Sequence, residues 1–144
     1  MFLRSTRLVA VVATALLLVL APVATAAERV TITIDANDTL GETFTATGST
    51  LCPEGTAETF FDHFGGGWRA GSFHLFKELT CEDGSGTFVI RVNAATVFGS
   101  PTDQGGWSVV FGTGEYEGLN GGGNLVGTYY EGGIIDVYTG AVQN

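Results

Sequence analysis

The stretch GTGEYEGLNGGGNLVG, residues 112–127, decides between two fold classes, and seven of its sixteen residues are glycine. Glycine-rich segments of this kind either hold a phosphate at the start of a helix or form turns in a β-sheet. A phosphate loop has a strand before it and a helix after it. Here the spacing is GxGxxxG, no GK[ST] follows, and the next residues, NLVGTYYEG, alternate like a strand. The stretch therefore predicts a hairpin in an all-β protein.

Asn120-Gly121 is the strongest hairpin signal in this stretch, because both central residues of a type I′ turn need a positive φ. Gly112, Gly114 and Gly118 are expected in the preceding strand, where glycine marks a bulge, a bend or a close approach. If that strand alternates regularly, these glycines share one face with Tyr116. The space on that face predicts either a large neighbouring side chain or a ligand lined by Gly112, Gly114, Tyr116 and Gly118.

Apolar and polar residues alternate along the rest of the chain, and no segment carries a helical period. The alternation predicts eight strands, at residues 29–35, 42–48, 56–64, 70–79, 86–97, 105–112, 124–132 and 134–142. Short turns separate the strands, so neighbours should pair antiparallel. Closure into an eight-stranded antiparallel β-barrel would remove both sheet edges, and a β-sandwich is the alternative. Several strands are apolar on both faces, so partner subunits of a homo-oligomer, a dimer or trimer, could cover the outer face.

The first 26 residues predict a secretory signal peptide. Arg4 and Arg7 form a basic start, an apolar run of 14 residues follows, and Ala24-Thr25-Ala26 fits a cleavage site. The run is shorter than the roughly 18 to 20 apolar residues of a spanning helix. We therefore expect one secreted β-barrel domain over residues 27–144, with no membrane segment once the signal is removed.

The charge of the chain argues against nucleic acid and anionic lipid as partners. Without Arg4 and Arg7, four basic residues remain against 15 acidic ones, and the formal net charge falls from −9 to −11. A chain this acidic repels phosphate-rich surfaces. The acidic residues are spread along the chain, which indicates solubility more than recognition of a cationic partner.

The two cysteines, Cys52 and Cys81, predict one disulfide, because an isolated pair in an exported chain is oxidised as a rule. A thiol nucleophile or a metal pair is the alternative, but neither a CxxC spacing nor a nearby histidine supports it. The bond would close a loop of about 30 residues and stabilise the fold by roughly 3–4 kcal/mol.

The chain resembles secreted bacterial proteins of the allene oxide cyclase-like and dirigent-like barrel group. The resemblance covers residues 48–140 and includes the pieces LCPEGTA, FHLFKELTCEDGSGTFVIRVNA and GGWSVVFGTGEY. It implies an antiparallel barrel, often dimeric or trimeric, with an apolar lumen in which plant members cyclise a fatty-acid epoxide or steer radical coupling of phenols. Only the hairpin motif matches residue by residue, at Gly112, Thr113, Gly114, Tyr116, Gly118, Gly121 and Gly123.

No catalytic or metal-binding pattern is present in the sequence. His63 and His74 lack the carboxylate spacing of a metal site, and DANDTLGETFTA departs from a calcium loop at its glycine and its final glutamate. We expect no metal and no cofactor. The weak catalytic candidates are polar residues that interrupt apolar strands, namely Lys77, Arg91, Glu115 and Tyr116. An inward Arg91 would need a carboxylate or a ligand beside it, whereas an outward Arg91 would simply be solvated.

Three functions remain open from the sequence. The first is a non-catalytic barrel that binds a small apolar or phenolic molecule, and it requires open space in the lumen. The second is a structural or oligomeric interaction module, which requires an apolar outer face. The third is an isomerase- or cyclase-like enzyme, which requires a buried acid or base that faces an open lumen.

Overall fold

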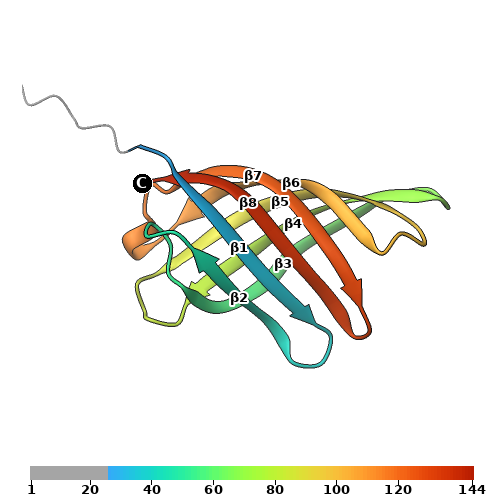
Figure 1. The fold of residues 1–144 in the computed structure, drawn as a ribbon, viewed down its shortest axis with the longest axis horizontal. Helices are drawn as coiled ribbons and strands as arrows, with labels where there is room; N and C mark the ends of the chain where they lie inside the picture. Colours follow the sequence, from blue (N-terminus) through green and yellow to red (C-terminus); the bar gives the residue numbers. More distant parts are fainter. Residues whose placement is uncertain (1–25) are drawn as a thin grey trace, which may run out of the picture.

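The computed structural model describes residues 26–144, so the signal peptide expected at residues 1–26 lies outside the described residues except for its last position. Eight strands fill most of the described chain (Figure 1). They are β1 (Glu28–Asn37), β2 (Gly41–Thr47), β3 (Glu54–Gly66), β4 (Ala70–Cys81), β5 (Thr87–Val97), β6 (Thr102–Gly112), β7 (Asn120–Tyr130) and β8 (Gly133–Gln143).

The strands form a closed antiparallel barrel in chain order, and β1 completes the circle by pairing with β8. The eight-stranded barrel expected from the alternation is therefore confirmed, and the sandwich alternative is not adopted. Closure gives each strand a hydrogen-bonded neighbour on both sides, but β2 pairs only with the first part of β3, Glu54–Ala57. With eight strands the interior is just wide enough for side chains or one small ligand.

The apolar face of each strand points into the barrel, because successive side chains of a strand point to opposite sides. Val30, Ile32 and Ile34 of β1 are buried, and Phe44 of β2 packs edge-on against Phe88 of β5 with ring centroids 6.0 Å apart. The alternation predicted for these strands is confirmed, and their apolar faces lie inward. The same core continues through Leu79, Ile90, Val92, Trp107, Leu125, Tyr138 and Val142.

Trp107 shows how small residues make room for large ones in the barrel. Its partners across β7 and β8 are Gly123 and then Gly140. Because Gly123 has no side chain, the indole of Trp107 crosses β7 and its Nε1 donates to the carbonyl of Thr139, 3.3 Å away. The ring then meets Tyr138 edge-on, with centroids 6.2 Å apart.

The prediction for the end of β6 is wrong in one respect. Regular alternation over the strand expected at residues 105–112 would put Trp107, Val109 and Phe111 on one face, but the pairing with β5 shifts between Val89 and Ile90. Such a shift places one extra residue in one strand and reverses the facing of the residues beyond it. As a result Trp107 is buried whereas 60% of Phe111 is exposed on the outer surface.

The glycine-rich segment also folds differently from the regular hairpin expected there. β6 ends at Gly112, and Asn120 and Gly121 lie inside β7 rather than in a type I′ turn. A short 3₁₀ helix, Gly114–Tyr116, joins the two strands. Gly114 and Gly118 have φ values of 61° and 89°, which residues with a side chain rarely adopt. The connection therefore turns sharply instead of continuing the strand.

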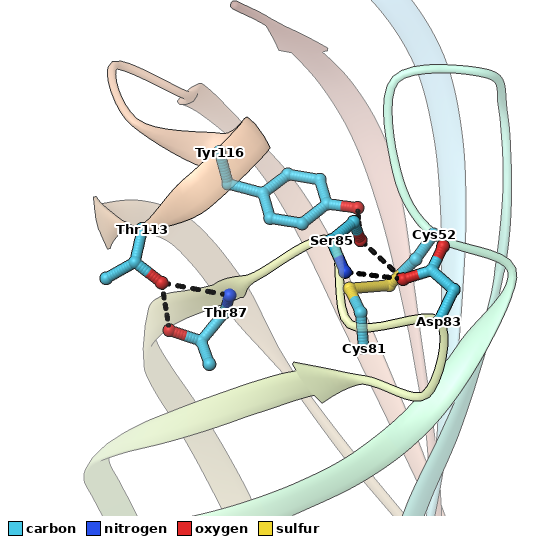
Figure 2. The surroundings of a disulfide bond; sticks show 7 residues. All are labelled: Cys52, Cys81, Asp83, Ser85, Thr87, Thr113 and Tyr116. Carbon is cyan, nitrogen blue, oxygen red and sulfur yellow. Dashed lines mark hydrogen bonds between the residues drawn. A yellow bond between two sulfur atoms is a disulfide. The ribbon is translucent and has the colours of Figure 1, made fainter.

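This turn folds Tyr116 back over one end of the barrel. Tyr116 is buried, its ring lies 5.3 Å from that of Phe88, and its hydroxyl is 2.8 Å from Ser85 Oγ in the β4–β5 turn. A side chain on Gly112 would overlap the carbonyl of Tyr116, so glycine is required for this close approach. Figure 2 shows the Tyr116 hydroxyl pointing to Ser85 beside the disulfide. Together these groups close the barrel at this end.

The disulfide predicted between Cys52 and Cys81 is present, with the two Cα atoms 5.9 Å apart. Both cysteines are buried, and they fasten the β2–β3 connection to the end of β4. The same connection is held from β1, where the carboxylate of Glu28 accepts hydrogen bonds from Ser49 and Thr50. These bonds lower the pKa of Glu28 to about 2.

The opposite end of the barrel is not covered in this way. Here the β3–β4 hairpin extends past the neighbouring strands (Figure 1). Its tip carries exposed aromatic side chains, among them Trp68, which is 80% exposed and lies against Arg69. Phe64 packs on Phe73, with centroids 5.0 Å apart. The barrel thus has one closed end and one open end.

Replacing both cysteines by alanine should lower the free energy of unfolding by about 3–4 kcal/mol, because the unfolded chain then regains the freedom of the loop. Urea unfolding without reductant measures this loss. Adding reductant should weaken the natural chain and leave the double variant unchanged. A double variant as stable as the oxidised chain would contradict this role of the bond.

Candidate functional site

A cavity of about 490 Å³ opens at the uncovered end of the barrel. Its walls are largely apolar, and all eight strands contribute to them. The aliphatic and Phe side chains of the lining are Ala36, Phe73, Leu75, Val92, Ala94, Leu125 and Ile134. A volume of this order suits a small molecule. The polar groups that line the same cavity determine what such a molecule would meet.

An ion pair lies on one side of the cavity. The Nζ atom of Lys77 donates to Glu42 Oε2 at 2.6 Å and to Thr59 Oγ1 at 2.8 Å. Thr59 in turn donates to the other carboxylate oxygen of Glu42, at 2.9 Å. Because the Lys77 side chain is only 5% exposed, its charge is costly to bury, and the ion pair with Glu42 offsets that cost.

A second polar group lies across the lumen on β6, β7 and β8. Asp103 of β6 pairs with Gly127 of β7, and Gly127 pairs with Asp136 of β8. The three residues form one row across the barrel wall, and both aspartates line the cavity. We call these residues the aspartate row. Both of its carboxylates are buried.

Burial opposes ionisation of the Asp136 carboxyl. Burial raises the pKa of its carboxyl, against the opposing attraction of Lys77 and a hydrogen bond from Tyr138. The Tyr138 hydroxyl donates to Asp136 Oδ2 at 3.1 Å. Burial raises the pKa of Tyr138 as well, so this hydroxyl keeps its proton and remains a donor. Asp136 can therefore accept hydrogen bonds or take up a proton inside the lumen.

Asp103 has a single partner for its two carboxylate oxygens. The Tyr129 hydroxyl donates to Asp103 Oδ2 at 2.5 Å. Partial burial and the Asp103 carboxylate raise the pKa of Tyr129 to about 12. The other oxygen, Oδ1, is withdrawn from solvent and has no hydrogen-bond partner among the described residues. A buried acceptor without a donor costs free energy, so this oxygen is a site where a donor would bind favourably.

The four residues that the sequence singled out for catalysis do not come together. Lys77 lies in the lumen, as its interruption of an apolar face suggested. Arg91 and Glu115 are exposed, and Tyr116 is buried at the closed end. The predicted ligand-lining set of Gly112, Gly114, Tyr116 and Gly118 also lies at that closed end, and none of these residues lines the cavity. The glycines there allow the turn that carries Tyr116, and no open face forms between them.

The sequence did carry a signal for the residues that it failed to identify. Those residues are Glu42, Asp103, Tyr129 and Asp136. Asp136 is in phase with Tyr138 and Val142, and Asp103 is in phase with Trp107, so both interrupt inward faces just as Lys77 does. Strand register was still needed to show that β6 and β8 bring the two aspartates to the same level.

A second hollow, of about 570 Å³, lies on the outside of the barrel, and Phe60, Phe76, Glu78, Val89, Val110 and Phe111 line it. Phe60 stacks on Phe76 with centroids 5.8 Å apart, yet 57% of Phe60 remains exposed. This outer groove is the larger of the two spaces. The open-end cavity is the better candidate site, because polar groups converge there within apolar walls.

Three further findings concern metal-ligating groups, the histidines and membrane-spanning helices. Within residues 26–144, no three histidine, cysteine or carboxylate side chains lie close enough to hold a metal ion. His63 and His74 stack on the exposed β3–β4 hairpin, and His74 Nδ1 lies 2.7 Å from Asn93 Oδ1. No helix in the described part of the chain is long and apolar enough to cross a membrane.

Comparison of the chain with protein-family models, with curated proteins and with solved structures finds no match. The resemblance to the allene oxide cyclase-like and dirigent-like group therefore stays a prediction. What the site can do has to be argued from its own geometry.

Replacing Glu42 by glutamine should lower the free energy of unfolding by about 3 kcal/mol, because the buried Lys77 charge would lose its counter-ion. Chemical unfolding at neutral pH measures the change. The matched control replaces both partners, Glu42→Leu with Lys77→Met, and should recover most of the loss. If the double variant is as unstable as Glu42→Gln, the pair is not coupled as described.

Replacing Asp136 by asparagine should raise the free energy of unfolding at neutral pH. The folded-state pKa of Asp136 lies above its ordinary value of 3.8, so ionisation costs the folded chain more than the unfolded one. The gain should shrink as the pH falls and vanish below 3.8, where both states of the natural chain are protonated. Unfolding curves across this pH range measure the gain. A variant less stable than the natural chain at neutral pH would contradict the assignment.

Proposed function

We propose that this protein binds a small, largely apolar or phenolic molecule in the open end of its barrel. The observation that carries the proposal is the cavity itself, whose largely apolar lining includes Asp103, with its buried Oδ1 unpartnered among the described residues. A phenol has an apolar ring and a hydroxyl donor, which match the walls and that oxygen respectively. Binding sites for small molecules combine these two features.

The polar lining of the lumen also supports binding over simple packing. Lys77, Asp103 and Asp136 are all buried, and each charged group costs free energy to remove from water. Apolar residues could fill the same positions and would stabilise the barrel more. Polar groups that weaken a fold yet face an open cavity are characteristic of functional sites.

We further propose that the protein works outside the cell. A disulfide between Cys52 and Cys81 fits an extracellular protein, because such bonds persist in oxidising compartments. The pattern of the first 26 residues agrees with export. A soluble carrier or sensor of a small molecule would suit that location.

A second candidate function is a structural role in a homo-oligomer. The outer groove over β3 to β6 favours it, because Phe60, Val110 and Phe111 leave an apolar surface exposed. Large exposed apolar patches often mark interaction surfaces. Lumen binding and oligomer formation use opposite faces of the sheet, so a test confined to the lumen separates them.

The test is binding of 2-naphthol, a neutral fluorescent phenol, followed by titration of its emission. Ala94 lines the lumen, and Ala94→Phe should weaken binding by at least about tenfold because the larger ring occupies the cavity. Ala95→Phe is the matched control, since its neighbour Ala95 is exposed on the other face of β5 and the same change there should have no effect.

Two results would count against the proposal. The first is the absence of 2-naphthol binding to the natural chain. The second is equal binding by Ala94→Phe and the natural chain, which would place the probe outside the lumen, with the outer groove as the obvious alternative.

A further inference from the structure

We propose that the aspartate row, Asp103, Gly127 and Asp136, is a subsite for an organic ammonium group, so that the lumen prefers amines with an apolar body. This inference rests on the proposed binding function and specifies its ligand class. It depends on the position of the two carboxylates, on their hydrogen bonds and on the balance of charge in the lumen.

The room for the Asp136 carboxylate comes from Gly127. Gly127 pairs with Asp103 of β6 and with Asp136 of β8, and both aspartate side chains face inward. The Oδ1 atom of Asp136 lies 2.6 Å from the point where a Cβ on Gly127 would stand. The carboxylate of Asp136 therefore leans over β7 toward β6, where any side chain at position 127 would obstruct it.

Each aspartate has one oxygen that accepts a hydrogen bond from a tyrosine and one that does not. Tyr129 donates to Oδ2 of Asp103, and Tyr138 donates to Oδ2 of Asp136. Oδ1 of Asp103 has no partner among the described residues, and Oδ1 of Asp136 lies over Gly127. The remaining acceptors belong to the two carboxylates on either side of the glycine. An ammonium group has three N–H donors and can bond to both.

The charge of the lumen favours a cation. Four carboxylates line the cavity, those of Asp38, Glu42, Asp103 and Asp136, and Lys77 is the only basic residue among the described lining residues. Lys77 is already paired with Glu42. Lys77 also attracts Asp136, but one lysine faces four carboxylates. The lining therefore keeps an excess of negative charge, which should attract an ammonium group and repel a carboxylate.

An organic cation fits the row better than a metal ion does. The row offers two carboxylates, whereas the described residues contain no group of three metal-ligating side chains. The apolar lining next to the row, including Leu125 and Ile134, suits a hydrocarbon body rather than a hydrated ion. The ligand class is thus an amine with an apolar or aromatic body.

The experiment compares three ligands that share one body and differ in the head group: 2-(2-naphthyl)ethylamine, 2-(2-naphthyl)ethanol and 2-naphthylacetate. Their dissociation constants are measured at neutral pH by fluorescence titration. The amine should bind at least about tenfold more tightly than the alcohol, and the carboxylate more weakly than both. The three ligands differ only in the head group, whose charge is attracted or repelled by the aspartate row.

Variants then locate the preference. Asp103→Asn removes one charge, keeps the shape of the side chain and should reduce the amine-to-alcohol ratio by about tenfold or more. Asp136→Asn should reduce the same ratio and provides a second variant that is expected to fold well. Glu115→Gln removes one charge from the exposed surface at the closed end and should leave the ratio unchanged.

The outcomes separate this inference from the proposed function. Equal binding of amine and alcohol by the natural chain would overturn the ammonium subsite and leave lumen binding standing. Failure of all three ligands and of 2-naphthol to bind would overturn both. A preference for the amine that persists in Asp103→Asn and Asp136→Asn, or that falls equally in Glu115→Gln, would also overturn the subsite, because general charge attraction would then explain it.

Discussion

Closure of the sheet is the constraint on which the rest of this structure depends. Once β1 pairs with β8, every strand has two neighbours, and the width of the interior is fixed by the number of strands. The inward side chains must then fill that interior or leave a cavity of molecular size. Here the half near the disulfide is filled, and the other half holds a cavity of about 490 Å³.

Glycine sets the shape of the interior on the β7 side. Gly123 gives the indole of Trp107 a path across β7 to Thr139, and that half of the barrel is packed. Gly127 lies four residues further along β7, and it pairs with Asp103 on one side and with Asp136 on the other. In the first case a large ring fills the space above the glycine. In the second case Asp136 Oδ1 and Ile134 Cδ1 lie over the glycine, 2.6 and 2.8 Å from the point where its Cβ would stand.

Much of the fold could be predicted from the sequence, because alternation determines which side of a strand is apolar. Ile32, Phe44, Ile90 and Val92 are buried as expected, and the cysteines pair as expected. The errors lie after Val109, where a register shift turns Phe111 outward and the chain folds Tyr116 back as a cover. A bulge leaves little trace in the pattern of a single strand, because only the partner strand shows the extra residue.

The candidate site was harder to predict than the fold for a related reason. Each polar residue of the lumen is alone in its own strand, with Lys77 in β4, Asp103 in β6 and Asp136 in β8. In the pattern of a single strand, such a residue can equally be a solvated side chain or a sign that the assumed alternation is off by one residue. Only the register across β6, β7 and β8 shows that two carboxylates lie on either side of one glycine.

The measurement that tests this account most directly is the change in backbone amide NMR shifts when the ¹⁵N-labelled protein is saturated with 2-naphthol. If the open end of the lumen is the binding site, the largest changes should fall on Asp103, Gly127 and Asp136. The amides of Val89 and Phe111 at the outer groove should move little. Largest changes at the outer groove, or no changes at all, would contradict the central claim that this barrel is built around a ligand site.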